Sequence, residues 1–427
     1  MAEARVLEFA EALEVVLEHA AGVGRPTAET VALLESAGRV LAEKVKADRD
    51  QPPFDRSTRD GFAVRAEGWS AGAQLKIAGQ VRAGGEQLRG TMRPGMAIEI
   101  MTGAAVPRGA DAVAMLEHAE QEEGQVWAAA GRKVRAGENI VEKGSQAQRG
   151  EVVVGPGTRM GAAEIALTAA CGYAELAVYR RPSVAIVATG DELVELDATP
   201  GAHQIYNSNG YALATLVAAA GGQGLRLGIA RDVRKDVRAR ISAGRKRDLL
   251  LLSGGVSAGK YDLVEDVLAE FGAEFFFTGV KMQPGKPVVF GRLPKDSGGI
   301  STHVSKARRG APDSVKWTYF FGLPGNPIST QVTFHCFVEP LLGALCGGGV
   351  AGPKFVQATL TEDVSGKAGL TRILPAMLKH DFARPEVRLV DWQGSGDLAA
   401  NARANCYAVL PDGQDQRAGD VITVLLR

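Results

Sequence analysis

The 427-residue sequence contains only four cysteines, and no two of them form a C-x-x-C pair. Their wide spacing (Cys171, Cys336, Cys346, Cys406) disfavours a disulfide framework or a zinc site and favours free, buried thiols in a reducing compartment. Hydrophobic runs are short as well, and none approaches the ~20 apolar residues that a membrane span needs. The first residues lack a basic segment followed by an apolar run, so they do not predict a signal peptide. These absences predict a cytoplasmic protein that is not held in a membrane.

Net charge is also missing, because Lys and Arg together number 49 and Asp and Glu together number 49. Without an excess of basic residues, the chain has no general electrostatic attraction for nucleic acid, and any anion site must be local. The composition, 45% hydrophobic and 23% charged, is that of a soluble globular protein. A chain of this length is expected to form two to four domains.

Changes in pattern divide the chain into four parts. Residues 1–50 predict two helices and residues 145–181 return to a helical pattern, so these segments are expected to form one helical or linker domain. Residues 51–144 carry short alternating runs between glycine turns and predict an inserted β-rich domain. Residues 182–347 alternate apolar strands with helices, which predicts a parallel sheet in a three-layer α/β/α domain. Residues 348–427 predict a small C-terminal β domain.

One segment, residues 295–317, is polar, basic and rich in glycine and serine. Loops of this length without structure of their own are uncommon inside a domain. We expect a solvated surface insertion, with a lid over a functional site as the alternative.

Three strand–loop junctions of residues 182–347 carry polar residues where parallel sheets bind ligands. They are Thr189-Gly-Asp-Glu192, the glycine-rich run from Ser253 to Asp262, and Gly322-Leu-Pro-Gly-Asn-Pro-Ile-Ser. Glycines allow backbone N–H groups to turn toward an anion, and neighbouring carboxylates suit Mg²⁺ shared with substrate phosphates. The pattern predicts a phosphate and magnesium site at this edge of the sheet.

Each acidic residue also has a simpler interpretation. Thr189-x-x-Glu192 and Asp262-x-x-Glu265 both fit a capping box, so Glu192 and Asp262 could merely start helices. The glycine run also resembles a nucleotide-binding P-loop, but Tyr261 stands where Ser or Thr must bind Mg²⁺, which disfavours that interpretation.

Seven motifs in order resemble those of the MoeA family, the molybdopterin molybdenumtransferases related to the E domain of gephyrin. The resemblance spans nearly the whole chain. The motifs are Pro52-Pro-Phe-Asp-Arg-Ser-Thr-Arg-Asp-Gly-Phe-Ala, Met101-Thr-Gly-Ala-Ala-Val-Pro-Arg-Gly-Ala-Asp-Ala-Val, Thr189-Gly-Asp-Glu-Leu, Asn207-Ser-Asn-Gly, Ser253-Gly-Gly-Val-Ser-Ala-Gly, Gln283-Pro-Gly-Lys-Pro and Gly322-Leu-Pro-Gly-Asn-Pro.

The resemblance implies a four-domain homodimeric enzyme that inserts molybdenum into molybdopterin. Such an enzyme takes adenylylated molybdopterin and molybdate as substrates, cleaves the pyrophosphate link with Mg²⁺, and releases AMP and the molybdenum cofactor. Its active site is expected between the α/β domain of one subunit and the β-rich domain of the other.

The resemblance also implies roles for individual residues. Asp60 and Thr102 match catalytic positions in the β-rich domain, although Asp60-Gly61 could instead be only a turn. Glu192 and Asp262 match catalytic, metal-binding positions. The residues that match substrate-binding positions are Ser253, Gly254, Gly255 and Ser257 in the pterin-phosphate loop, with Lys286, Pro324, Gly325, Asn326, Ser329 and Ser395.

Two departures from the family pattern remove positive charge. Gln283 stands where many members have Lys, and Pro375 aligns with a position that is usually Arg. Both positions would face a dianionic oxyanion, so molybdate affinity depends on a substitute, for which Lys281 and Arg372 are the candidates.

Two other functions remain open from the sequence. The chain could be a molybdopterin adenylyltransferase, which shares the α/β domain, although the additional domains disfavour this. It could also be a pterin-binding carrier or scaffold that lacks insertion activity, which Gln283 and Pro375 make conceivable. Molybdopterin adenylyltransferase and molybdoenzyme acceptors are the expected protein partners, and no residue distinguishes molybdate from tungstate.

Overall fold

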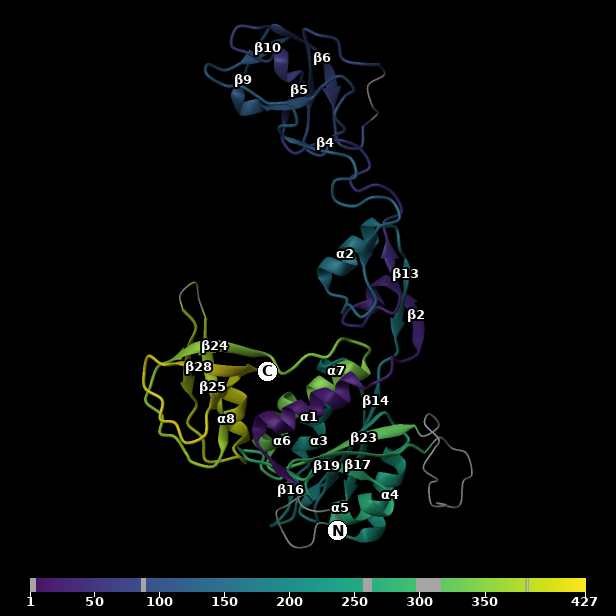
Figure 1. Cartoon of the computed structure of the whole chain (residues 1–427), viewed down its shortest axis with the longest axis vertical. Helices are drawn as coiled ribbons and strands as arrows, with labels where there is room; N and C mark the ends of the chain where they lie inside the picture. The colour runs from purple at the N-terminus through teal and green to yellow at the C-terminus, as the bar shows by residue number, and fades with distance from the viewer. Residues whose placement is uncertain (1–4, 86–89, 256–262, 297–315, 381, 383) are drawn as a thin grey trace. The chain divides into compact units, whose positions relative to one another are not determined.

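The computed structural model describes residues 5–85, 90–255, 263–296, 316–380, 382 and 384–427. The chain forms two compact units (Figure 1). The larger unit contains Met1–Val31, Gly38–Ala42 and Ala177–Arg427, and the smaller unit contains Ala32–Ala37 and Glu43–Leu176. All four cysteines are buried and free, as predicted. Within the described ranges, no helix is both long and apolar enough to cross a bilayer.

A six-stranded sheet with the order β17-β14-β18-β23-β22-β19 forms the centre of the larger unit. Its strands are β14 (Ser183–Thr189), β17 (Gln223–Ala230), β18 (Leu249–Ser253), β19 (Glu274–Phe277), β22 (Val289–Pro294) and β23 (Trp317–Leu323). β14, β17, β18 and β23 are parallel, which confirms the prediction for these strands. β22 runs antiparallel to β19 and β23. A short buried apolar run carries no signal for strand direction, so the sequence did not distinguish this strand.

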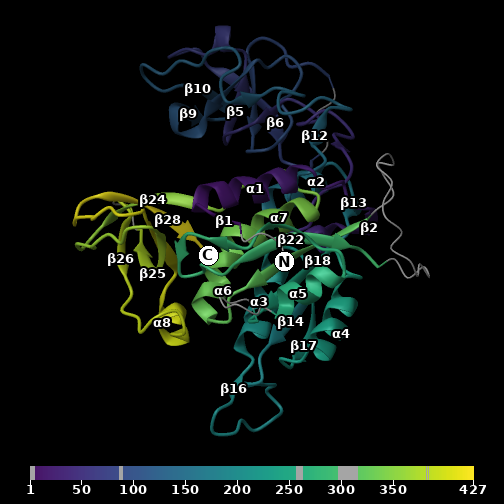
Figure 2. The same cartoon turned by 60° about the horizontal axis from the view of Figure 1, so that its bottom comes forward.

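Helices cover both faces of the sheet and complete the predicted three layers (Figures 1 and 2). One face packs against α4 (Arg234–Gly244) and α5 (Leu263–Glu270). The other face packs against α1 (Phe9–Ala21), α3 (Ser208–Ala219), α6 (Pro327–Thr333) and α7 (Glu339–Leu345). A π-helical turn, η4 (Phe334–Val338), joins α6 to α7.

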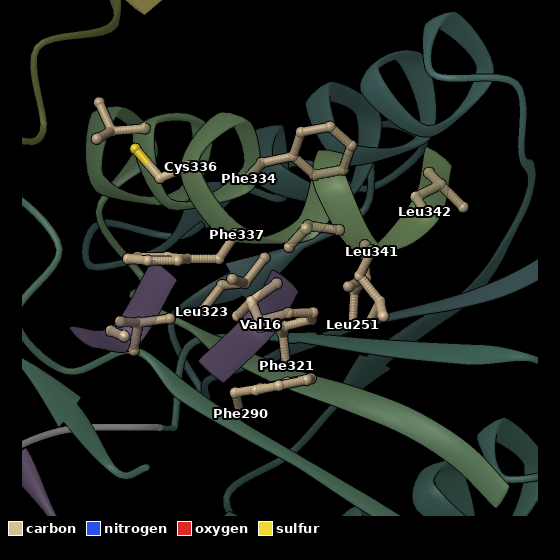
Figure 3. Packing of buried hydrophobic residues seen from close by; sticks show 14 of the residues in the cluster. Val16, Leu251, Phe290, Phe321, Leu323, Phe334, Cys336, Phe337, Leu341 and Leu342 are labelled. Carbon is tan, nitrogen blue, oxygen red and sulfur yellow. The ribbon is translucent and has the colours of Figure 1, made fainter. Parts of the chain in front are cut away.

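The core on this second face includes the N-terminal helix (Figure 3). Val16 of α1 is fully buried in the same cluster as Leu251, Phe321 and Phe337, and the rings of Phe9 and Phe337 lie 5.7 Å apart. Burying a large apolar side chain stabilises a fold by about 1.5–3 kcal/mol. Helix α1 is therefore part of the α/β layer structure, although more than 160 residues separate it in sequence from the first strand of the sheet.

The C-terminal part of the larger unit is a small β domain, as predicted. Its elements are β24 (Phe355–Leu360), β25 (Thr371–Lys379), β26 (Glu386–Leu389), α8 (Leu398–Arg403), β27 (Cys406–Leu410) and β28 (Val421–Leu426). The sheet closes on itself because β25 pairs with both β26 and β27. β21 (Met282–Gln283) pairs with the start of β25 and so joins the α/β layers to this domain. Two more short pairs are β1 (Val6–Leu7) with β20 (Gly279–Val280) and β15 (Leu193–Val194) with β16 (Ile205–Tyr206).

The smaller unit contains a second six-stranded sheet, with the order β8-β5-β7-β6-β10-β9. Its strands are β5 (Gly61–Val64), β6 (Leu75–Val81), β7 (Met96–Ile100), β8 (Ala112–Met115), β9 (Ala119–Glu122) and β10 (Gln125–Ala128). Separate apolar clusters involve Phe62 and Val64, and Ala63 and Ile98, as expected for strands buried on both faces. These strands agree with the β-rich segment predicted from residues 51–144. Short 3₁₀ turns lie at η2 (Ala66–Gly68) and η3 (Leu116–His118).

The second helix predicted for the first fifty residues is wrong. In its place lie β2 (Ala28–Ala32), the 3₁₀ turn η1 (Leu33–Ser36) and β3 (Val45–Lys46). β2 pairs with β13 (Glu175–Tyr179), and β3 pairs with β12 (Val152–Val154). Pairing with distant strands has therefore overridden the local helical pattern. Between β12 and β13 lies α2 (Ala162–Ala170), and β4 (Arg56–Ser57) pairs with β11 (Ile140–Val141).

Candidate active site

A pocket of about 560 Å³ lies between the α/β layers and the C-terminal β domain of the larger unit. Trp392 and Gln283 form part of its wall. Six residues predicted to bind substrate also line it: Lys286, Pro324, Gly325, Asn326, Ser329 and Ser395. Residues separated by more than 100 positions in sequence thus meet around one cavity, which we call the main pocket.

Backbone and side-chain hydrogen bonds hold the two walls of the main pocket together. Asn326 Nδ2 donates to Ser395 Oγ at 2.7 Å, and the Ile328 amide donates to the Ser395 carbonyl oxygen at 3.0 Å. Gly285 has φ +114°, and a Cβ there would lie 2.7 Å from Thr333 Cγ2. Glycine is therefore required where the segment carrying Lys286 approaches α6.

The polar groups of the main pocket suit an anion. Lys286 carries an ammonium group, and Ser329, Ser395 and Asn326 carry hydroxyl and amide donors. The described residues that line the pocket include no carboxylate. An oxyanion could therefore accept hydrogen bonds there without repulsion from any carboxylate among the described lining residues.

The two candidate substitutes for the missing charges do not line the main pocket. Lys281 is paired with Glu8, and Arg372 Nη1 donates to the Ser365 carbonyl oxygen at 2.7 Å. A residue that sequence reasoning missed, Lys367, instead donates from Nζ to Gln283 Oε1 at 3.2 Å. The Gln283 amide oxygen is thus engaged, which leaves its NH₂ group as the donor that can face a ligand.

The glycine-rich loop after β18 is held in a conformation that needs glycine. Gly254 and Gly255 have φ +88° and +67°, and a Cβ at either position would lie within 2.6 Å of an oxygen of Thr189. The Gly254 amide donates to the Leu323 carbonyl oxygen at 3.0 Å, which ties this loop to the end of β23. Ser257 and Asp262 lie outside the described residues.

Asn209 connects two of the predicted loops, and sequence reasoning assigned it no role. Its Nδ2 donates to Ser253 Oγ at 2.9 Å and to the Gly325 carbonyl oxygen at 2.7 Å. The only sequence signal was its place in the Asn207-Ser-Asn-Gly motif, in which Asn207 caps α3 by accepting from the Gly210 amide. Asn209 therefore holds Ser253 of the glycine loop beside a wall of the main pocket.

Glu192 is not a helix cap, so that alternative is wrong. Thr189 ends β14, and the next element is the short strand β15 rather than a helix. The Glu192 carboxylate folds back over Gly190, where a Cβ would lie 2.4 Å from Glu192 Oε2. Burial, and then the charges of Asp191 and Glu192, raise the pKa of Asp232 above its ordinary value. The carboxylates of Asp191, Glu192 and Asp232 thus lie near one another at this edge of the sheet, together with Arg231, whose Nη1 donates to the Asp191 carbonyl oxygen at 2.9 Å.

This carboxylate edge fits a magnesium ion only in part. Exposed carboxylate oxygens are hard ligands of the kind that Mg²⁺ prefers. Among the residues described by the structure, however, no group of three His, Cys, Asp or Glu side chains is arranged to hold a metal. Glu192 could thus supply one ligand, while other oxygens would have to come from substrate phosphates and water.

Asp60 and Thr102 lie together in the smaller unit, on the segments where sequence analysis expected them. Asp60 Oδ1 accepts hydrogen bonds from the Thr102 amide at 2.6 Å and from Thr102 Oγ1 at 2.7 Å. These bonds, the backbone one first, hold the pKa of Asp60 below its ordinary value. Gly61 is required beside it, because a Cβ there would lie 1.9 Å from the Ala114 carbonyl oxygen. Asp60 is therefore an exposed carboxylate whose position is fixed by its two hydrogen bonds with Thr102.

Three family models match the chain in order. The MoeA N-terminal region (domain I and II) matches residues 7–172, a probable molybdopterin binding domain matches residues 185–344, and the MoeA C-terminal region (domain IV) matches residues 357–426.

Curated relatives and solved structures agree with these matches. A molybdopterin molybdenumtransferase of Nostoc sp. is 36% identical over 395 residues, which cover 90% of this chain and 85% of the relative. The Bacillus subtilis protein of the same name is 33% identical over 407 residues, covering 93% and 89%. A molybdopterin biosynthesis MoeA protein of Pyrococcus horikoshii superposes with a TM-score of 0.71 at 30% identity, covering 99% of both chains. A second structure of MoeA from that organism gives 0.78 at 26% identity, covering 99% of this chain and 100% of the other. The chain belongs to the MoeA family of molybdopterin molybdenumtransferases.

Proposed function

We propose that this protein inserts molybdenum into molybdopterin, using adenylylated molybdopterin and molybdate and releasing AMP. The observation that carries the proposal is the main pocket, where Lys286, Ser329, Ser395 and Asn326 surround one cavity with no described carboxylate in its wall. Family membership supports the insertion of molybdenum, because the relatives are named molybdopterin molybdenumtransferases.

In this proposal the main pocket binds molybdate. Lys286 contributes a mobile positive charge, and the hydroxyl groups of Ser329 and Ser395 donate to the oxyanion. Gln283 donates to the oxyanion through its NH₂ group. Lys367 Nζ donates to the amide oxygen of Gln283 and places a positive charge next to that side chain. Lys367 thereby offsets part of the charge that Gln283 and Pro375 do not supply.

The loop after β18 binds the pterin phosphate through Ser253, Gly254 and Gly255. Close packing of the two glycines on Thr189 fixes the direction of their backbone groups. The carboxylate of Glu192, together with Asp262, is proposed to hold Mg²⁺ beside the phosphates, where the ion would supply charge neutralisation as the pyrophosphate link breaks.

Asp60 and Thr102 are proposed to act on the same substrate from a second subunit of a homodimer. The adenylyltransferase that makes the substrate and the molybdoenzymes that receive the cofactor are the proposed protein partners. Four free cysteines favour a reducing compartment, and we propose the cytoplasm.

The test is release of AMP from adenylylated molybdopterin in the presence of Mg²⁺, with either molybdate or tungstate. We expect AMP and active cofactor from the wild-type protein and a large loss with Lys286→Met. The matched control is Lys281→Met, which removes a nearby lysine that is paired with Glu8 and does not line the main pocket.

Two results would contradict the proposal. Binding of adenylylated molybdopterin without release of AMP would identify a pterin carrier. Formation of adenylylated molybdopterin from ATP and molybdopterin would identify an adenylyltransferase.

A further inference from the structure

A buried network of polar side chains joins the α/β layers to the C-terminal β domain. Gln331 comes from α6, Asn401 from α8 and Tyr407 from β27, and all three residues are buried. Asn401 Nδ2 donates to Gln331 Oε1 at 2.9 Å, and the Tyr407 hydroxyl donates to Asn401 Oδ1 at 3.0 Å. We call these three residues the amide clamp, and none of the roles above uses it.

The amide clamp favours a single arrangement of α8 against α6, because its polar atoms are out of water. Burial raises the pKa of Tyr407 to about 12, so the phenol keeps its proton and remains a donor to Asn401. A buried amide that loses its partner still carries the cost of desolvation. Arg427 Nη1 also donates to the carbonyl oxygens of Asn401 and Ala404, at 2.8 and 2.6 Å, and so holds the end of α8. A buried network of this kind makes the contact between the two helices rigid.

Both helices of the amide clamp lead directly to a wall of the main pocket. Ser329 lies on α6, two positions before Gln331. Ser395 lies two positions before Asp397, the N-cap of α8, whose Oδ1 accepts from the Ala400 amide at 2.9 Å. A shift of α8 against α6 would therefore move Ser395 relative to Ser329 across the pocket.

The contacts of Ser395 show what its placement achieves. The Ile328 amide lies in the first turn of α6, where helix amides have no partner within the helix, and it donates to the Ser395 carbonyl oxygen at 3.0 Å. Asn326 Nδ2 donates to Ser395 Oγ at 2.7 Å, so the hydroxyl oxygen is engaged as an acceptor. The hydroxyl group can then turn its hydrogen toward an anion in the pocket.

We propose that Gln331 and Asn401 are positioning residues for the capture of the oxyanion. Their amide–amide bond holds α8 against α6 and so keeps the Ser395 hydroxyl at the same cavity as Lys286 and Ser329. This inference rests on the proposed function, since it assigns the amide clamp a role in binding molybdate. Gln331 and Asn401 do not line the main pocket, and they act on the ligand only through Ser395.

The experiment uses variants that keep the size of a side chain and remove its polar group. Asn401→Leu and Gln331→Met each leave a buried partner unpaired, and Tyr407→Phe removes one bond of the amide clamp while keeping the ring. Loss of one hydrogen bond to a charged ligand corresponds to about a tenfold or greater change in affinity. We expect Asn401→Leu and Gln331→Met to raise the KM for molybdate in AMP release by about that factor, with Tyr407→Phe changing it in the same direction. The kcat at saturating molybdate and the KM for adenylylated molybdopterin should stay at their wild-type values.

Two controls separate positioning from a general loss of stability. Asn405→Leu removes the two hydrogen bonds, of 2.7 and 2.8 Å, that the Asn405 side chain makes with the backbone of Leu378 inside the C-terminal domain. Its KM for molybdate should equal that of the wild type. Gln331→Glu keeps an acceptor for Asn401 and for Arg427, whose Nη2 lies 3.5 Å from Gln331 Oε1, and should also keep the wild-type KM. Thermal melting identifies the folded variants, and Tyr407→Phe decides the question if Asn401→Leu does not fold.

Hydrogen exchange at the Ile328 amide gives a second measurement that needs no turnover. Because this amide is bonded to Ser395, its exchange should be about tenfold or more faster in Asn401→Leu and Gln331→Met than in the wild type or in Asn405→Leu. An unchanged KM for molybdate in the folded clamp variants, or an equal rise in Asn405→Leu, would overturn the inference. Faster Ile328 exchange in the clamp variants of a protein that releases no AMP would instead contradict the proposed function and leave the placement of Ser395 by the amide clamp intact.

Discussion

Replacing Gly254 by alanine is expected to displace the loop after β18. At φ +88° an alanine is strained by roughly 1–2 kcal/mol, because left-handed backbone brings Cβ close to the following carbonyl oxygen. The new Cβ would also lie 2.6 Å from the Thr189 carbonyl oxygen, and overpacking of this kind costs about 1–3 kcal/mol. Thr189 cannot easily yield, because it is paired with Ala230 in the sheet.

Together these terms are about 2–5 kcal/mol if the loop keeps its position. A shift of the loop would relieve the strain but would lengthen the 3.0 Å bond from the Gly254 amide to Leu323 and move Ser253 away from Asn209. We therefore expect a lower melting temperature, a raised KM for adenylylated molybdopterin, or both. Thermal unfolding and the AMP-release assay measure these two effects separately.

Gly325→Ala is the matched control for the thermal-unfolding measurement, because it makes the same change on the neighbouring loop. A Cβ at Gly325 would lie 3.6 Å from Gly254 Cα, which is an ordinary contact, and its φ is not in the left-handed region. Its stability should remain within about 0.5 kcal/mol of the wild type. Gly254→Ala protein that melts and turns over like the wild type would refute the reasoning that the site requires this left-handed turn.

Three further predictions concern charge and assembly. Asp248 is 12% exposed and accepts hydrogen bonds from Arg180, Lys295 and Ser183, which outweigh the opposing effect of burial and hold its pKa below the ordinary value. Asp248→Asn should therefore lower the free energy of unfolding in urea by about 2–3 kcal/mol, since Arg180 is partly solvated, whereas Asp266→Asn at an exposed position should change it by under ~0.5 kcal/mol. The stabilisation by ionised Asp248 is present above the unfolded-state pKa near ~4 and is lost as pH falls below that value. Equal effects of the two variants would contradict this prediction. Thr102→Val removes one of the hydrogen bonds that lower the pKa of Asp60, so the acid limb of the pH profile for AMP release should move to higher pH. Thr102→Ser keeps the hydroxyl group and is the control. An acid limb that does not move would show that ionisation of Asp60 does not determine its position. Mixing Asp60→Ala chains with Lys286→Ala chains should restore about a quarter of wild-type activity if subunits exchange at random. About half of the dimers would then be heterodimers, and each heterodimer would have one intact site out of two. Remixed dimers without activity would exclude a shared site.

The sequence predicted most of the α/β layers because their signals are local. Continuous apolar runs such as residues 184–188 and 249–252 are typical of strands buried on both faces, and β14 and β18 lie there. The direction of β22 carried no such signal. The prediction of a helix within residues 27–48 was wrong for a different reason. This segment forms β2 and β3, which pair with strands more than 100 positions away in sequence.

The site was predictable as a set of motifs but not as an arrangement. Glycines at Gly254, Gly255 and Gly285 could be read as turns, yet only the structure shows that Thr189 and Thr333 leave no space for a Cβ. Asn209 and Lys367 were missed because each acts through another residue across more than 40 positions of sequence. Whether an amide or ammonium group faces a pocket depends on such tertiary partners, which periodicity does not reveal.

The place of α1 in the core has a consequence for how the chain is made. Val16 leaves the ribosome early, but Phe337 and Leu341, which belong to the same buried cluster, are synthesised more than 300 residues later. At ~5–20 residues per second, the apolar face of α1 would wait roughly 15–65 s for these partners. During that interval the apolar face of α1 must be exposed to water, packed against another part of the nascent chain or bound by a chaperone. The same separation means that loss of α1 would expose Phe337 and Leu341 even though every residue proposed to bind substrate would still be present.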